Sequence, residues 1–194
     1  MPLKSVQDRR VQKTHNLLRE ALVSLIAEKP YDSIVVKEIL DRANVGRSTF
    51  YTHFRDKDDL LASGIYNMLG PLPVPARTQG KGLERVLWFS LPIFEHHYRH
   101  AHAWGDRIGP RGRAILHEHL RRVLTEIIGE VMRKDFQFGQ SARNIPLEVF
   151  SAYVASTFVL VLNWWLNRKM RMPPSAVNGI FRMLVLPTLE AAGR

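Results

Sequence analysis

The feature that most constrains the fold is a helical periodicity that runs through almost the whole chain and stops only at prolines and glycines. Apolar residues recur at three- and four-residue spacing, whereas the alternation typical of strands is almost absent. The spacing predicts helices over residues 9–28, 35–43, 47–53, 57–69, 83–100, 113–134, 146–169 and 175–192. We therefore expect an all-α protein.

One segment, residues 70–82, breaks this pattern with three prolines and three glycines. Such a composition is typical of loops and linkers. It predicts a domain boundary, with an N-terminal domain over residues 1–69, a linker over 70–82 and a helical C-terminal domain over 83–194.

Two short helices of the N-terminal domain, 35–43 and 47–53, are joined by the tight turn Asn44-Val45-Gly46. This arrangement is the helix-turn-helix pattern, whose second helix enters the major groove of DNA. Many helical bundles contain a similar turn, so the turn alone leaves a plain packing role open.

The outward face of the second helix favours DNA binding. It presents a run of polar side chains without an acid: Arg47, Ser48, Thr49, Tyr51, Thr52 and His53. Such side chains can donate hydrogen bonds to phosphates and base edges. Lys57 follows at the start of the next helix, where a cation opposes the helix dipole and a nearby phosphate would favour it.

The net charge of +10 favours an anionic partner, yet residues 1–69 carry only +2 of it. The charge alone therefore does not point to the N-terminal domain. Its first residues are more informative, because Lys4, Arg9, Arg10 and Lys13 are opposed only by Asp8. They form a basic arm, which can also be read as a solvated tail.

The N-terminal domain resembles that of tetracycline-repressor-type (TetR) regulators. The resemblance lies in a long first helix ending before Tyr31-Asp32, then VVKEILDRANV and GRSTFYTHFRDKDDLL. The second half resembles the dihydroxyacetone-kinase-activator-type subfamily in IFEHHYRHAHAW and in YVASTFVLVLNWWL, followed by Met172-Pro173. The resemblance implies a nine-helix protomer, a homodimer through the last two long helices and a small-molecule effector.

The resemblance also implies residue roles. Tyr51, Thr49 and Lys57 would contact phosphates, and Lys37 would lie at the DNA backbone. Arg47, Ser48, Thr52 and His53 would face base edges or flanking phosphates. Val35 stands where the family often has Thr, so a hydroxyl is missing there, and we expect Ser33 to cap the helix instead.

Aromatic side chains of the C-terminal domain are candidates for the lining of a ligand pocket: Trp88, Phe89, Phe94, Trp104 and Phe158. A role in the plain core explains each of them equally well. Trp164 and Trp165 point to different faces of one helix, so we expect a partner to cover one of them. With Phe181 and Leu184 they form the predicted dimer interface.

Six of the eight histidines lie between His96 and His119. His96 and His100 are one helical turn apart, as metal ligands often are. Few carboxylates and many arginines surround them, so we expect no metal and no cofactor. The stretch Gly109-Pro110-Arg111-Gly112 could form an anion-binding turn, although a plain interhelical turn is favoured.

Other functional classes find little support. The absence of cysteine excludes disulfides, thiol catalysis and cysteine-ligated metals, and it suits the cytoplasm. The longest apolar stretch, 152–166, falls short of the roughly 20 residues of a membrane span, which predicts a buried helix and no membrane partner. HExxH, phosphate-loop and Gly-x-Ser-x-Gly motifs are missing, so we expect no enzyme.

We therefore predict a cytoplasmic, ligand-responsive transcriptional repressor that binds a palindromic DNA site as a homodimer. Two alternatives stay open. One is a co-regulator that acts through protein contacts of its C-terminal domain, and the other is a histidine- and metal-dependent enzyme.

Overall fold

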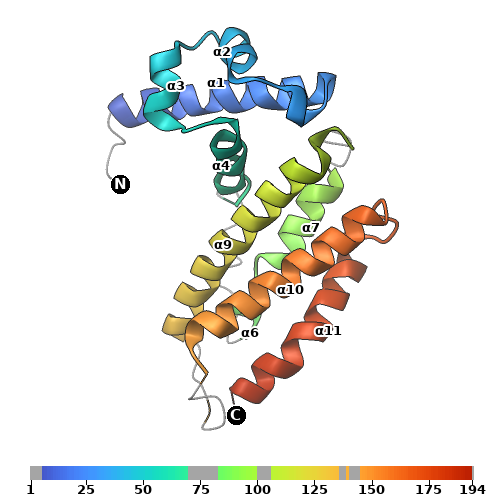
Figure 1. Ribbon diagram of the computed structural model, residues 1–194. Coiled ribbons are helices and arrows are strands. Elements are labelled where there is room, and N and C mark those ends of the chain that lie inside the picture. The colour runs from blue at the N-terminus through green and yellow to red at the C-terminus, as the bar shows by residue number, and fades with distance from the viewer. Residues whose placement is uncertain (1–5, 70–82, 100–105, 136–138, 140–144, 194) are drawn as a thin grey trace. The chain divides into compact units, whose positions relative to one another are not determined.

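The computed structural model describes residues 6–69, 83–99, 106–135, 139 and 145–193 (Figure 1). The described elements are α1 (Val6–Glu28), η1 (Tyr31–Ser33), α2 (Val36–Ala43), α3 (Arg47–His53), α4 (Lys57–Leu69), α6 (Leu83–Val86), α7 (Ser90–Arg99), η2 (Asp106–Ile108), α9 (Gly109–Asp135), α10 (Leu147–Asn167) and α11 (Pro174–Ala192). The described residues contain no strand. The predicted all-α fold is confirmed.

Two helices differ from the prediction because of prolines. The helix expected over 83–100 is broken at residues 87–89, since in a continuous helix the ring of Pro92 would clash with the Trp88 carbonyl. The helix restarts at Ser90, so that Pro92 falls in its first turn, where proline is tolerated. The helix expected from residue 113 begins at Gly109, whose φ of 66° suits glycine, and Pro110 follows it.

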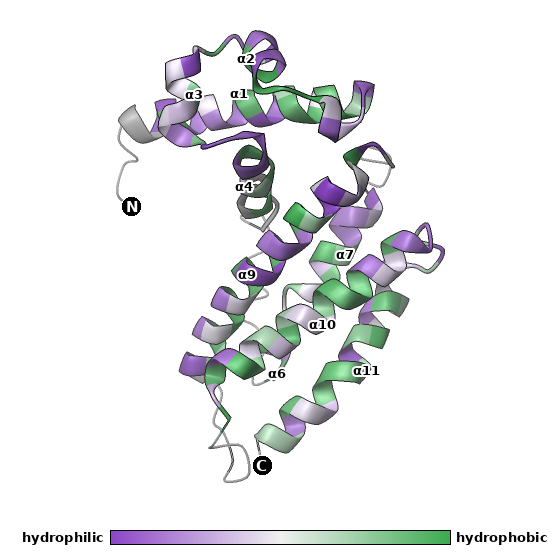
Figure 2. Ribbon diagram, in the orientation of Figure 1, coloured by the Kyte–Doolittle hydropathy of each residue, from purple (hydrophilic) through white to green (hydrophobic). Residues whose placement is uncertain are grey.

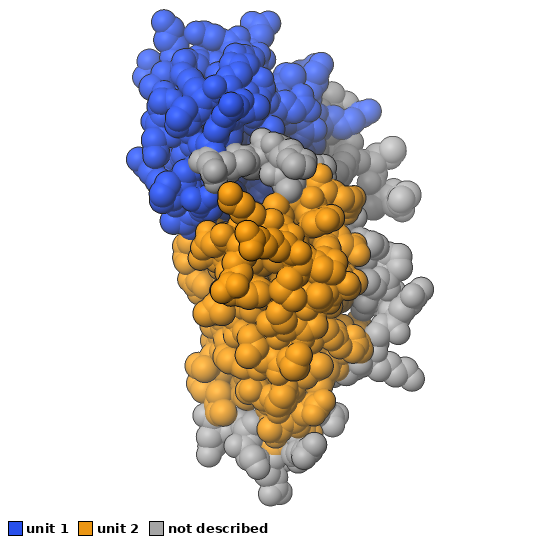
Figure 3. Space-filling model, turned by 90° about the vertical axis from the view of Figure 1, so that its right-hand side faces the viewer, with its two compact units in different colours: residues 1–67, 101–116 blue, residues 68–100, 117–194 orange. Residues whose placement is uncertain are grey.

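The chain divides into two compact units, drawn in blue and orange in Figure 3. Unit 1 comprises residues 1–67 and 101–116, and unit 2 comprises residues 68–100 and 117–194. The first turns of α9 therefore belong to unit 1, which periodicity alone does not indicate. The predicted linker over 70–82 lies outside the described residues.

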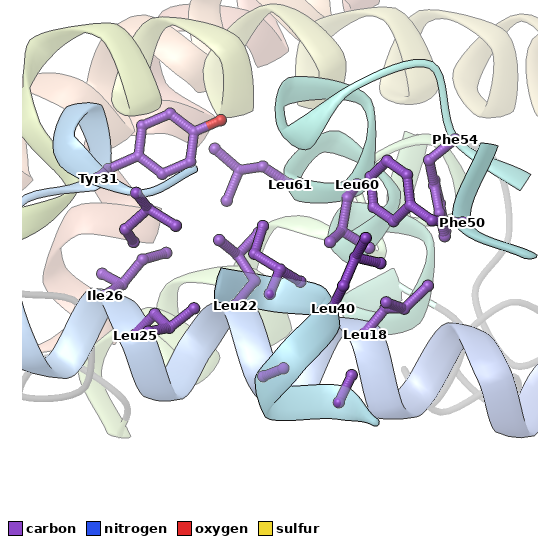
Figure 4. Close-up of a cluster of buried hydrophobic side chains, with 14 of the residues drawn as sticks. Leu18, Leu22, Leu25, Ile26, Tyr31, Leu40, Phe50, Phe54, Leu60 and Leu61 are labelled. Carbon is purple, nitrogen blue, oxygen red and sulfur yellow. The ribbon is translucent and has the colours of Figure 1, made fainter. Parts of the chain in front are cut away.

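Unit 1 is built on α1, whose apolar stripe of Leu18, Leu22, Leu25 and Ile26 is almost fully buried. Figure 4 shows side chains from η1, α2, α3 and α4 converging on this stripe. Ile108 of η2 joins the same core. Removing these side chains from water is the main driving force that holds the short helices together.

Polar contacts fix α2 along α1. Arg42 donates to both carboxylate oxygens of Glu28, at 2.6 and 2.8 Å, and to Ser24 at 2.6 Å. Lys29 pairs with Glu38 at 2.5 Å. All four charged groups are substantially exposed, so each pair contributes at most about 1 kcal/mol. Their role is to fix orientation rather than to supply most of the stability.

Unit 2 packs α7, α10 and α11 around an aromatic core. The Phe158 ring lies 5.1 Å from that of Phe89, 4.9 Å from that of Phe94 and 5.3 Å from that of Phe181, between centroids. Helix α10 is apolar and long enough to cross a membrane by composition, with a mean hydropathy of 1.6. In the structure one face of α10, which includes Val154, Phe158 and Trp165, packs into this core, whereas Val149 and Leu160 remain exposed, so the helix is only partly buried.

Candidate nucleic-acid interface

The turn between α2 and α3 is closed by Asn44 rather than by glycine. Asn44 ends α2 in the left-handed region, with φ 50° and ψ 48°, and the Val45 amide donates to the Leu40 carbonyl at 3.1 Å. Asparagine tolerates this conformation better than most residues. Gly46 has φ −67° and precedes α3 as an ordinary extended residue. The predicted tight turn is confirmed. Its left-handed residue is Asn44, two positions before Gly46, where a glycine would ordinarily indicate it.

The start of α2 lacks the expected hydroxyl cap. Ser33 donates to the Pro30 carbonyl at 2.7 Å and therefore does not cap α2 as expected. Instead, the Glu38 carboxylate accepts the Val35 amide at 3.0 Å, which is one half of a capping box. The carboxylate that holds Lys29 thus also fixes the start of α2.

Helix α3 has one buried anchor and a broad polar face. Phe50 is fully buried and contacts Phe54, while Tyr51 at the next position is 48% exposed. The other exposed side chains of α3 are Arg47, Ser48, Thr49 and Thr52. The Arg47 guanidinium lies over the Tyr51 ring, 5.6 Å from its centroid. Lys37 on α2 is exposed as well, so six of the eight side chains predicted to bind DNA are available to a partner.

His53 is placed differently from these six. Its ring lies edge-on to that of His15 on α1, with centroids 4.8 Å apart, and it is only half-exposed. Phe54 packs against His15 on the same side, at 4.8 Å. His53 therefore ties the end of α3 to α1, which leaves it poorly placed to read bases.

The histidine pair predicts a pH-dependent stability. Burial lowers the pKa of His15, and the charges of His53 and Arg19 lower it further. Because the folded-state pKa lies below the unfolded one, the unfolded chain binds the extra proton first, and stability falls as the pH drops through about 6.5. We expect the melting temperature to fall between pH 7 and pH 5, and to fall less in His15→Gln. Equal slopes in both proteins would contradict this role of His15.

Lys57, the other half-buried member of the predicted set, contacts the protein's own backbone. Its ammonium group donates to the carbonyls of Tyr31 at 2.9 Å, Asp32 at 3.2 Å and Ile34 at 2.7 Å. It also lies 4.5 Å from the centroid of the Tyr31 ring. All three donors are used in this conformation, so a phosphate contact by Lys57 stays a prediction that requires these bonds to be exchanged. The three carbonyls explain why a cation is tolerated at the start of α4.

A network that the sequence did not reveal lies beside Lys57. The Tyr31 hydroxyl donates to Asp58 at 2.5 Å, and Arg111 from the first turn of α9 donates to the other oxygen of Asp58 at 2.7 Å. Burial opposes ionisation of Asp58, but these two hydrogen bonds hold its pKa below the ordinary value. Burial and the bond to Asp58 raise the pKa of Tyr31. The Gly109–Gly112 stretch begins α9, and its Arg111 side chain binds this carboxylate.

Lys57→Met is expected to lower the free energy of unfolding by about 1–3 kcal/mol, because the partly buried carbonyls of Tyr31 and Ile34 lose their donor. Urea unfolding measures this effect, with Lys37→Met as the control, since Lys37 is exposed. If Lys57→Met instead leaves stability unchanged and weakens only DNA binding, Lys57 acts on a phosphate as the resemblance implies.

The remaining candidates belong to the predicted C-terminal domain. Phe89, Phe94 and Phe158 are fully buried and pack on one another, Trp88 is nearly buried, and Trp104 lies outside the described residues. Trp165 and Phe181 are 1% and 0% exposed, so the protomer's own core already covers them. Their predicted place in the dimer interface is therefore wrong, and both are core residues. Trp164 is half-exposed and Leu184 is exposed.

Comparison with known proteins decides the family. Residues 18–63 match the model of bacterial regulatory proteins of the tetR family, and residues 87–186, just over half of the chain, match a transcriptional regulator C-terminal region of that family. The chain belongs to the TetR family. The first match contains α2, α3 and the start of α4, so the helix-turn-helix described above is that of a TetR-family regulator.

A short stretch of the chain is also similar to a helix-turn-helix regulator. A 59-residue stretch is 39% identical to the uncharacterized HTH-type transcriptional regulator YxbF of Bacillus subtilis (strain 168), and it covers 30% of this chain and 16% of that relative. Outside this short stretch, the likeness to YxbF gives no further information.

Solved TetR-family structures share the fold. A TetR regulator from Streptococcus agalactiae 2603V superposes with a TM-score of 0.57 at 23% identity, covering 93% of this chain and 97% of that one. FadR from Bacillus subtilis, in complex with stearoyl-CoA, gives 0.57 at 16% identity, covering 87% and 96%. The dihydroxyacetone kinase operon activator DhaS gives 0.55 at 14% identity, covering 93% and 98%, and so shares the fold.

Proposed function

We propose that this TetR-family chain is a homodimeric repressor that reads a palindromic operator with α3 and is released by a small-molecule effector. The exposed, acid-free face of α3 is the observation that carries the proposal. Phe50 anchors this helix in the core, so its polar side chains are presented on a rigid element. Rigid presentation limits the entropy that a side chain loses on binding.

Six residues carry the proposed DNA contacts. Thr49 and Tyr51 bind phosphates, and Lys37 reaches the backbone from α2. Arg47, Ser48 and Thr52 face base edges, where an arginine can pair with guanine through two hydrogen bonds. His53 and Lys57 are assigned to positioning α3 and α4, since their polar atoms or rings already contact the protein.

The proposed dimer forms through α10 and α11. Large apolar side chains remain exposed on these helices: Val149, Leu160, Met183 and Leu184. Figure 2 shows hydrophobic colour along both helices. Exposed apolar patches of this kind are typical of protein interfaces, and two-fold symmetry is the commonest way to close one. A two-fold dimer presents two copies of α3 to half-sites about 34–36 Å apart, or a multiple of that distance.

The proposed effector is a small molecule that binds in the C-terminal domain. FadR was solved with stearoyl-CoA, and RolR, which has a similar fold, was solved with resorcinol. In this chain the candidate lining residues Phe89, Phe94 and Phe158 form a closed cluster, so an effector must displace one of these rings to enter. The repressor acts on the chromosome and therefore in the cytoplasm.

Selection of DNA fragments from a random pool tests this function. We expect a palindromic motif for the wild-type protein, and Arg47→Ala should relax the preference at one position per half-site by about 1–3 kcal/mol. Arg133→Ala, which removes the same charge from the exposed end of α9, is the matched control. A failure to select any motif would favour the co-regulator alternative, and a motif identical for wild type and Arg47→Ala would remove Arg47 from base reading.

A further inference from the structure

The turn that joins α10 to α11 encloses a pocket with an unusual combination of side chains. It has a volume of about 350 Å³ and lies within unit 2. Its lining combines two tryptophans and a methionine with three cations: Trp164, Trp165, Asn167, Arg168, Lys169, Arg171 and Met172. Ligand pockets typically measure roughly 300–1,000 Å³, so this one can hold a small organic molecule.

The turn has one well-defined shape. The Trp165 indole N–H donates to the Met172 carbonyl at 2.9 Å, and the Met170 amide donates back to the Trp165 carbonyl at 3.1 Å. Lys169 and Met170 take left-handed φ angles of 55° and 49°. This conformation costs about 1–2 kcal/mol for each non-glycine residue, and the buried Trp165 ring holds it in place.

The cations of the pocket have no opposing acid. Arg168, Lys169 and Arg171 are exposed, the lining contains no carboxylate, and none of the three forms an ion pair within the described part of the chain. By contrast, Arg42, Arg111, Arg121 and Arg182 are each paired with a carboxylate. The dipole at the end of α10 favours cations at 168 and 169, but Arg171 lies beyond its last turn.

The apolar part of the pocket defines the shape of its ligand. The Arg168 guanidinium lies over the Trp164 ring, 5.2 Å from its centroid, and so forms a flat cationic and aromatic surface. Trp164 is half-exposed, which leaves part of that ring accessible. A planar molecule fits such a surface, and arginine matches a carboxylate with two parallel hydrogen bonds.

We propose that this pocket binds a small aromatic carboxylate. The carboxylate pairs with Arg168 and Arg171, Lys169 adds positive charge, and the ring lies against Trp164 and Met172. The site adjoins the aromatic cluster around Phe158 through Trp165, whose ring lies 5.6 Å from that of Phe94 between centroids, and its occupation can be measured without DNA.

Isothermal titration calorimetry at low salt tests the proposal with cinnamate, a flat aromatic carboxylate, and with cinnamyl alcohol, its neutral counterpart. We expect cinnamate to bind at least tenfold more tightly than the alcohol. Arg168→Gln combined with Arg171→Gln should weaken cinnamate binding at least tenfold and affect alcohol binding much less. Trp164→Ala should weaken both ligands.

The matched control is Arg133→Gln combined with Lys134→Gln, which removes two charges from the last turn of α9. Thermal melting of each variant verifies that it is folded. The proposal is overturned if wild type does not bind cinnamate at millimolar concentration, if both ligands bind equally, or if the control pair weakens cinnamate as much as the pocket pair. The last result would mean that cinnamate binding depends on the overall charge of the protein and not on the pocket.

Discussion

Phe50→Ala is expected to lower the free energy of unfolding by about 3–5 kcal/mol, the cost of deleting a fully buried phenylalanine ring. Typical domains have only about 5–15 kcal/mol of stability, so this variant should lose a large part of it. The ring packs against Phe54 and anchors α3 to α1, and its removal leaves a cavity at the base of the DNA-binding helix.

Tyr51→Ala, at the next position, is the matched comparison because Tyr51 is exposed. Its stability should stay within about 1 kcal/mol of wild type, since exposed substitutions rarely cost more. Its operator affinity should fall, with the slope of log K against log salt reduced by roughly 0.9 for one lost phosphate contact. Urea unfolding and DNA titrations at several salt concentrations separate the two variants. Two variants with equal stability would disprove the role of Phe50 as anchor.

The second large effect concerns the proposed dimer. Leu160→Glu combined with Leu184→Glu should convert the dimer to a monomer, because these side chains are 64% and 49% exposed and the proposed interface would bury their new charges. Burying unpaired carboxylates costs several kcal/mol each. Sedimentation at micromolar concentration should show the monomer, and affinity for a palindromic site should fall at least a hundredfold.

Ala191→Glu adds an exposed charge to the last turn of α11 and serves as the control, with no change of mass expected. Phe181 is unsuitable for this test, since its ring is buried in the protomer and a charge there would unfold unit 2. A wild-type protein that sediments as a monomer, or a double variant that stays dimeric, would disprove the proposed interface.

Local patterns predicted most of the helices because local physics sets their ends. Asp56 caps the start of α4 by accepting the Asp59 amide at 2.8 Å, and Asp59 accepts the Arg55 amide at 3.1 Å. The bounds of α3 were predicted to the residue. The break at residues 87–89 could also have been foreseen from Pro92, because its effect on the preceding turn is local.

The parts that could not be predicted depend on contacts between residues distant in sequence. Nothing near Lys57 indicates that its ammonium would find the carbonyls of Tyr31 and Ile34. Periodicity placed Trp165 and Phe181 on apolar faces, but it could not say whether the protomer's core or a partner covers such a face. Pocket linings and hydrophobic cores are made of the same residue types, so the sequence alone does not decide between these two roles for Phe158.

Unit 1 is built from two separate stretches of the chain, and this affects how it folds during synthesis on the ribosome. Asp58 and Arg111, which pair in the folded unit, are 53 residues apart. At roughly 5–20 residues per second, the ribosome needs about 3–11 s to add the segment between them. During that interval α1 to α4 can form, while Tyr31 and Asp58 still lack Arg111 and the cover of Ile108 and Gly112. The nascent DNA-binding helices therefore acquire their final stability only after part of the C-terminal half has been made.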